Sequence, residues 1–162
     1  MERARNESIP CYHLSGKAHP DPNDLDRTIL ETLTRHRVSL VVLAGYMKLL
    51  GPLTIGKYRG HILNSHPALL PAHGGKGMYG RHVHEAVLLS QGPVTGVTIH
   101  HVDEQYDHGP IVARREVPVL PEDTPSSLMD RVQHRERRLW VETLQAISLG
   151  SLDLDRSEAL TA

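Results

Sequence analysis

A continuous apolar run, "VSLVVLAG" at residues 38–45, constrains the fold of this chain more than any other stretch. Its short length, its β-branched valines and its closing glycine favour a strand that is buried on both faces. Strands of this kind are typical of parallel sheets that helices cover on both sides. The run therefore predicts an α/β protein.

Strand and helix patterns alternate along the rest of the chain. Leu25, Ile29 and Leu33 recur at helical spacing and predict an amphipathic helix. Thr124 is suited to cap a later helix, because Pro125 then takes the favoured first position. This order of elements predicts a Rossmann-like, three-layer open sheet, largely parallel with antiparallel C-terminal strands. We expect strands at 9–14, 38–45, 60–66, 94–102 and 111–119, and helices at 24–37, 80–92 and 125–147.

Size, charge and cysteine content narrow the class of protein. The 162 residues are enough for one domain with a sizeable core. Lys and Arg (18) nearly balance Asp and Glu (19), so we expect neither nucleic acid nor anionic lipid as a partner. Cys11 is the single cysteine, which excludes an internal disulfide and favours the reducing cytoplasm. The start "MERARNESIP" has no apolar segment of a signal peptide, and Lys48 interrupts the longest apolar stretch.

The stretch "LNSHPALLP", residues 63–71, places polar side chains where a buried strand ends. Asn64 and His66 are two apart and so point to the same side of an extended chain. In an open α/β sheet, ligands bind beyond the carboxyl ends of the strands, and Pro67 favours an extended His66. A strand-end turn with a hydrogen-bonded histidine is the alternative interpretation, because one Asn-x-His pair is common by chance.

A carboxylate follows the next strand. Asp107 lies in the turn-rich segment "DEQYDHGP", residues 103–110. A carboxylate beside an imidazole holds its ring, a protonated histidine can shuttle a proton, and an asparagine can donate to an oxyanion. The set contains no activated serine or cysteine, so we expect direct attack by a substrate nucleophile in an acyl-type transfer.

The 12 histidines raise the question of a metal site. His82 and His84 are two apart in an expected helix and so do not share a face, while His100 and His101 point to opposite sides of a strand. We therefore expect no metal, with a meeting of His73, His82 and His84 in three dimensions as the alternative.

Longer stretches carry a family resemblance. The blocks "NSHPALLPAHGGKGMYGRHVHEAV", "GVTIHHVDEQYDHGPIVARREVPV" and "RVQHRERRLW" resemble the glycinamide ribonucleotide formyltransferases, within the folate-dependent formyltransferase superfamily. The resemblance extends from Glu2 to about Gly150 and includes "VVLAGYMKLL". It implies one catalytic domain over residues 1–150, followed by a polar tail at 151–162.

The resemblance implies a reaction and a set of site residues. A formyl group would move from 10-formyltetrahydrofolate to the amine of glycinamide ribonucleotide in purine biosynthesis, without a metal. Asn64, His66 and Asp107 would be the catalytic residues, and Pro67, Gln133 and Glu136 would contact the ribonucleotide. The implied folate contacts are Tyr46, Met47, Lys48, Leu49, Leu50, His100, Val102, Asp103 and Asp107.

One part of the family pattern has no counterpart in this sequence. The family begins with a strand and a glycine-rich loop that binds the ribonucleotide phosphate through backbone N–H groups. From its absence we expect weaker binding of the ribonucleotide and unpaired strand edges, which a homodimer or a strand rearrangement would cover. The alternative is that the first methionine is internal to a longer protein.

Other functions fit the same superfamily motifs. A formyltetrahydrofolate hydrolase and a methionyl-tRNA formyltransferase are the enzymatic alternatives. A binding module that keeps a folate pocket without catalysis, or acts as a partner subunit, is an alternative of another class.

Overall fold

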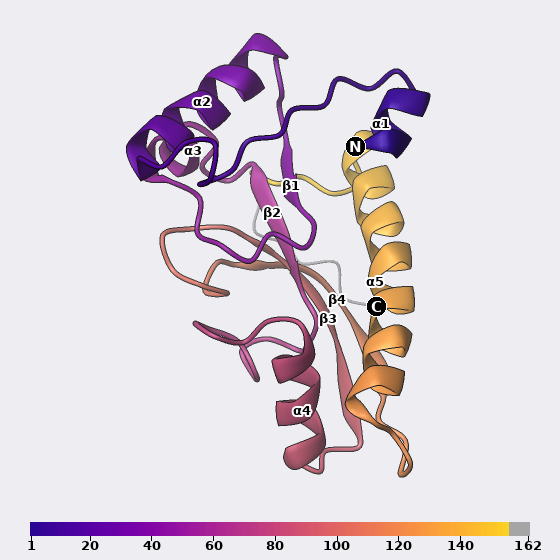
Figure 1. Ribbon diagram of the computed structural model, residues 1–162. Coiled ribbons are helices and arrows are strands. Elements are labelled where there is room, and N and C mark those ends of the chain that lie inside the picture. The colour runs from indigo at the N-terminus through magenta and orange to yellow at the C-terminus, as the bar shows by residue number, and fades with distance from the viewer. Residues whose placement is uncertain (156–162) are drawn as a thin grey trace. The chain divides into compact units, whose positions relative to one another are not determined.

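The computed structural model describes residues 1–155, and the chain divides into two compact units (Figure 1). The helical unit comprises Met1–Val38 and Leu50–Lys57. The sheet unit comprises Ser39–Leu49 together with Tyr58 and the residues that follow it. Residues 156–162, part of the expected polar tail, lie outside the described residues. The expected domain boundary at residue 150 stays a prediction.

The helical unit contains α1 (Glu2–Asn6), α2 (Pro22–Arg35) and α3 (Pro52–Lys57). The predicted helix at 24–37 is confirmed as α2, whereas α1 and α3 are too short to show a periodic pattern. Asp26 of α2 is buried and accepts hydrogen bonds from the backbone N–H groups of Leu53 (2.8 Å) and Thr54 (3.1 Å). One carboxylate therefore caps α3 and joins the two helices.

The predicted strand at 9–14 is wrong, because this segment is irregular. A strand needs a neighbour to satisfy its backbone N–H and C=O groups. Among residues 1–155 no strand pairs with this segment, so its apolar side chains alone do not make it extended in a sheet.

The sheet unit contains β1 (Val41–Leu43), β2 (Ile62–His66), β3 (Val94–His101) and β4 (Ile111–Pro118), in the spatial order β1-β2-β3-β4. β1 pairs with β2 in parallel, and the later neighbours pair antiparallel. The α/β class with antiparallel C-terminal strands is thus confirmed. The described sheet is mixed, with a smaller parallel share than predicted.

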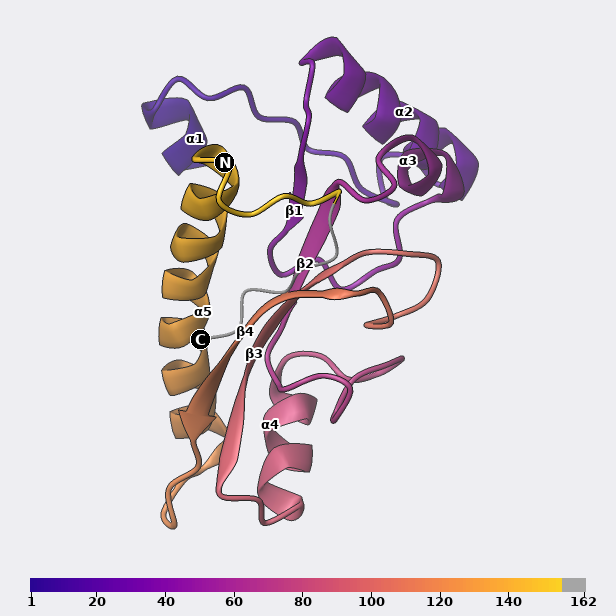
Figure 2. The same cartoon turned by 180° about the vertical axis from the view of Figure 1, so that it is seen from behind.

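Two helices complete the sheet unit, α4 (Arg81–Leu89) and α5 (Pro125–Ser148). The predicted cap of α5 is confirmed, since the Thr124 side chain accepts from the Ser127 N–H at 3.2 Å. Figure 2 shows α5 running along β3 and β4. Leu152, which follows α5, is buried with the core residues. The buried apolar cluster consists of Leu63, Ala68, Val83, Val87, Val97, Ile99, Val112, Ala113, Val117, Leu128, Val132, Leu139 and Leu152.

The register of β2 against β3 gives the sheet two different faces. Asn64 lies opposite His100, and His66 lies opposite Thr98, so these four side chains share one face. Ser65 lies opposite Ile99, and both belong to the other face. The alternation predicted for Asn64 and His66 is confirmed.

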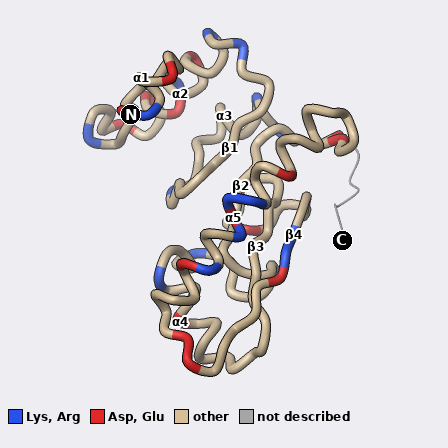
Figure 3. The backbone as a smooth tube through the Cα atoms, turned by 90° about the vertical axis from the view of Figure 1, so that its right-hand side faces the viewer, with Lys and Arg blue, Asp and Glu red and all other residues tan. Residues whose placement is uncertain are grey.

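No described helix is both long and apolar enough to cross a membrane. Figure 3 shows basic and acidic residues interspersed along the described chain, in keeping with the formal net charge of −1.

Candidate active site

His66 is the last residue of β2 and is only 3% exposed. Its Nε2 atom lies 2.8 Å from the carbonyl oxygen of His73, and its Nδ1 atom lies 3.4 Å from Oδ2 of Asp107. A carbonyl oxygen and an ionised carboxylate are both acceptors, so each ring nitrogen faces a group that favours an N–H. The ring is therefore held from both ends.

Asp107 links two histidines and a glycine. Its Oδ2 atom accepts a hydrogen bond from the Gly75 N–H at 2.9 Å, and its Oδ1 atom lies 3.5 Å from Nε2 of His100. Burial raises the pKa of Asp107, but the contacts with His100, His66 and Gly75 outweigh it and hold the pKa well below its usual range. Asp107 is therefore an ionised, half-buried carboxylate. Its φ of 53° lies in the left-handed region, which aspartate tolerates better than most residues.

Glycines let two backbone segments approach His66 and Asp107. A Cβ atom on Gly74 would lie 2.6 Å from Cδ2 of Leu70 and 3.3 Å from Cβ of Asp107. A Cβ atom on Gly109 would lie 2.0 Å from the carbonyl oxygen of His101. Side chains at these positions would push the His73–Gly75 segment and the Asp107 loop away from His66.

Asn64 and Asp107 both contact His100. Nδ1 of His100 lies 2.8 Å from the carbonyl oxygen of His101 and therefore carries a hydrogen. Nε2 lies 3.1 Å from Nδ2 of Asn64 and 3.5 Å from Oδ1 of Asp107. The Asn64 amide has two N–H groups, of which the contact with His100 uses at most one, so one is left for another acceptor.

Thr98 fixes the segment that leaves β2. Its buried hydroxyl donates to the carbonyl oxygen of Ala68 at 2.7 Å and accepts from the Leu70 N–H at 3.0 Å. The segment after His66 is thereby held against β3.

His84 of α4 is a further buried histidine near this site. Burial lowers its pKa, and the electrostatic influence of the neighbouring His66 lowers it further. Its Nδ1 atom has no hydrogen-bond partner among residues 1–155. The described part of the chain contains no group of three or more His, Cys, Asp or Glu side chains arranged to hold a metal.

The structure brings the three predicted catalytic side chains together, because Asp107 contacts His66 directly and reaches Asn64 through His100. Sequence reasoning missed the backbone groups of His73 and Gly75. The glycine pair in "HGGKG" was the available signal.

The predicted folate residues lie in several places. Tyr46, Met47, Lys48 and Leu49 are exposed in the segment after β1, and Leu50 is buried in the helical unit. His100 is buried beside Asn64 and Asp107. Val102 and Asp103 open the loop that carries Asp107, and the Asp103 carboxylate accepts from the Gln105 N–H and contacts Nδ1 of His108, both at 2.8 Å.

The predicted ribonucleotide residues differ in exposure. Pro67 is half-buried directly after His66, and Gln133 is exposed on α5. Glu136 is half-buried on α5 and accepts a hydrogen bond from the hydroxyl of Ser65.

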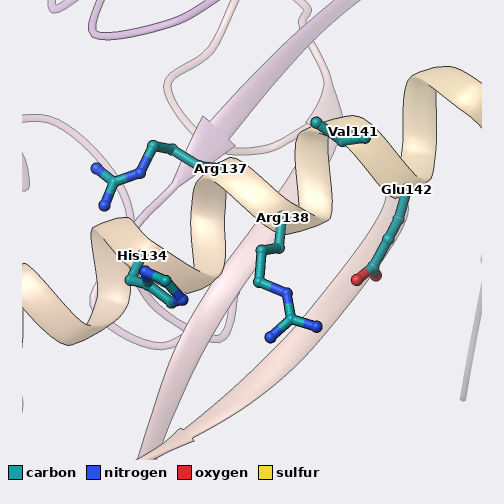
Figure 4. A pocket seen from close by; sticks show the side chains of 5 residues that line it. All are labelled: His134, Arg137, Arg138, Val141 and Glu142. Atoms are coloured by element: carbon teal, nitrogen blue, oxygen red, sulfur yellow. The ribbon is translucent and has the colours of Figure 1, made fainter.

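A pocket on α5 is lined by none of these predicted residues. Figure 4 shows its lining side chains projecting from the helix, and two of them are arginines that give it a basic character. The lining consists of His134, Arg137, Arg138, Val141 and Glu142.

Comparisons with known proteins show the family of this chain. Residues 1–144 match the family model described as formyl transferase. A phosphoribosylglycinamide formyltransferase of Bacillus subtilis is 33% identical over 147 residues, which make up 91% of this chain and 73% of the relative. A chloroplastic phosphoribosylglycinamide formyltransferase of Vigna unguiculata is 46% identical over 145 residues, or 89% of this chain and 46% of the relative. The chain thus spans about half the length of such plant relatives.

Solved structures show the same fold. The phosphoribosylglycinamide formyltransferase of Bacillus halodurans has 40% sequence identity and a TM-score of 0.82, covering 90% of this chain and 73% of that one. A formyltetrahydrofolate deformylase of Pseudomonas syringae has 25% identity and a TM-score of 0.70, covering 85% of this chain and 45% of that one.

Proposed function

Because this chain belongs to the formyl transferase family, we propose that it transfers a formyl group from 10-formyltetrahydrofolate to the amine of glycinamide ribonucleotide. The names of its plant and bacterial relatives support this choice of acceptor. The observation that carries the proposal is the His66 ring, held between the Asp107 carboxylate and the His73 carbonyl and close to Asn64. This is an arrangement for stabilising an oxyanion and moving a proton.

The chemical step begins with attack of the substrate amine on the formyl carbon. A new C–N bond forms, and the carbonyl oxygen becomes an oxyanion that the free N–H of Asn64 and an N–H of His66 stabilise. The contact of His66 Nδ1 with Asp107 is 3.4 Å long, whereas the contact of His66 Nε2 with the His73 carbonyl oxygen is 2.8 Å long. The longer contact is the weaker one, so the N–H at Nδ1 is the one that turns to the oxyanion. The bond from carbon to the folate nitrogen then breaks. The proton that the amine loses passes by way of Asp107 and water, and the leaving nitrogen takes one up.

The folate is placed against the backbone of the segment from Tyr46 to Leu50 and against the loop from Val102 to Asp107, with His100 beside the pterin. The ribonucleotide is placed against Pro67, Gln133 and Glu136. Exposure of the segment after β1, and its position directly beyond a strand end, support this placement.

We also propose a homodimer in the cytoplasm, with no metal. The edge position of β1, which has only β2 as a neighbour among the described strands, supports association with a second copy. Two plant relatives are named chloroplastic, and a Gallus gallus relative is named a trifunctional purine biosynthetic protein, so fractionation and ultracentrifugation are the deciding measurements.

The test is a product assay with 10-formyltetrahydrofolate, with and without glycinamide ribonucleotide. Formylated ribonucleotide is the expected product, and Asn64→Ala should slow its formation by on the order of 10²–10³-fold. The similarity to a deformylase favours hydrolysis as the second candidate, which would release formate equally well without the amine. Neither product, with retained folate binding, would instead identify a binding module and contradict the proposal.

A further inference from the structure

Ser65 lies between the two predicted catalytic residues of β2 but points to the opposite face of the sheet. Its hydroxyl oxygen accepts a hydrogen bond from the indole Nε1–H of Trp140 at 3.0 Å and donates to Oε1 of Glu136. Glu136 and Trp140 are four residues apart on α5, so they lie one turn apart on the same side of the helix. All three side chains are half-buried.

The donors and acceptors in this network allow one arrangement of hydrogens. An indole N–H can only donate, so the serine oxygen uses a lone pair to accept from Trp140. The single hydroxyl hydrogen of Ser65 then goes to Oε1 of Glu136, which must accept it. One oxygen of the Glu136 carboxylate is thereby fixed in direction, and the other oxygen, Oε2, keeps its lone pairs for a further donor.

The strand register places this network next to the reacting side chains. β1 pairs with residues Ile62, Leu63 and Asn64 of β2, and the structure gives Ser65 and His66 no partner strand on that side within the described residues. A ligand at this end of β2 can therefore meet the face that carries His66 and the face that carries Glu136. A ligand with an amine at one end and sugar hydroxyls at the other would suit this position. The amine would meet the face that carries His66, and the hydroxyls would meet the face that carries Glu136.

We infer that Ser65 and Trp140 are positioning residues that hold Glu136, so that its Oε2 atom accepts a hydrogen bond from a hydroxyl of the ribonucleotide. This inference rests on the proposed function for the identity of the ligand. Neither residue touches the substrate. They act by fixing one carboxylate oxygen and so directing the other.

Trp140 makes this network measurable, because it is the only tryptophan in the chain. Its indole is half-buried and hydrogen-bonded within the network, so its emission is sensitive to a ligand that binds at Glu136. Glycinamide ribonucleotide carries no aromatic base and does not absorb the excitation light. Adding it to the protein should shift the emission in a saturable manner, whether or not formyl transfer follows.

The decisive experiment combines this titration with steady-state kinetics on four variants. Ser65→Ala and Glu136→Gln should each raise the KM for the ribonucleotide about tenfold, with kcat and the KM for 10-formyltetrahydrofolate within about threefold of wild type. Ser65→Thr keeps the hydroxyl and should restore most of the affinity. Glu142→Gln is the matched control, because Glu142 is on the same helix but pairs with Arg135 and Arg115.

The outcomes separate this inference from the proposed function. His66→Ala should slow transfer by on the order of 10²–10⁴-fold but keep the emission shift. A wild-type protein that shows the shift without transfer would still support the network. An emission spectrum unchanged by saturating ribonucleotide would overturn the inference. So would Ser65→Ala and Glu136→Gln variants whose KM for the ribonucleotide stays within twofold of the Glu142→Gln control.

Discussion

The two faces of β2 and β3 are both buried, but they bury different kinds of side chain. One face carries His66, Thr98 and His100, which are 3%, 0% and 2% exposed. The other carries Leu63 and Ile99, both 0% exposed, which belong to the apolar cluster with α5. Adjacent residues of one strand therefore meet opposite requirements, because side chains alternate between the faces.

The difference shows what a buried polar face needs. Each polar side chain there has a specific partner, such as the His73 carbonyl for His66 and the Ala68 carbonyl for Thr98. A buried polar group without a partner is costly, so these contacts are conditions for the fold as well as for the chemistry. On the other face, the apolar cluster around Leu63 and Ile99 depends on shape and volume.

The largest effect on stability is expected on the apolar face. Ile99→Ala removes a fully buried side chain between β3 and α5 and should lower the free energy of unfolding by about 2–5 kcal/mol. Urea denaturation measures the loss. The kcat of the folded fraction should change little, and a large fall in kcat with unchanged stability would show that the two faces are not separate in function.

A smaller effect on stability is expected from the same type of substitution, threonine to valine, made once on each face. Thr98→Val leaves the Ala68 carbonyl and the Leu70 N–H without the hydroxyl and should cost about 1–3 kcal/mol. Thr95, also on β3, is buried on the apolar face, and its hydroxyl has no hydrogen-bond partner within residues 1–155. Thr95→Val should therefore be neutral or stabilising. Equal losses in urea denaturation would contradict the comparison.

The smallest effect on stability is a pH dependence at Asp107. Its pKa is lower in the folded protein than in the unfolded chain, so the unfolded chain binds the proton first as the pH falls. The stabilisation is present above the ordinary pKa of about 4 and is lost on acidification below it. The stability difference between wild type and Asp107→Asn should thus be constant from about pH 6 to pH 5 and shrink toward pH 3. Denaturation at each pH measures it, and a constant difference down to pH 3 would contradict the assignment.

The parts of the fold that local patterns encode could be predicted from the sequence. The run at 38–45 predicted β1, the alternation at 94–102 predicted β3, and Thr124 with Pro125 predicted the start of α5. The expected burial of β1 on both faces is wrong, because β1 lies at the edge of the described sheet and Val42 is exposed. Asn64 and His66 were assigned to one face because their spacing is fixed along a strand.

The remaining features depend on contacts that a linear pattern does not show. The segment at 9–14 looks like a strand, but it has no pairing partner among the described residues. The groups that hold His66 and Asp107 include the His73 carbonyl and the Gly75 N–H, and backbone groups have no side-chain signature. The hydrogen bond from Trp140 to Ser65 joins residues that are 75 positions apart in the sequence, so no local pattern indicates it.

The rate of formyl transfer by His66→Ala tests the central claim most directly. The assay uses 10-formyltetrahydrofolate and glycinamide ribonucleotide at saturation, with circular dichroism to confirm that the variant is folded. If the ring between Asp107 and His73 stabilises the oxyanion and supports the proton transfer through Asp107, the rate should fall by on the order of 10²–10⁴-fold. A folded His66→Ala protein that transfers formyl groups within a few-fold of the wild-type rate would contradict the account.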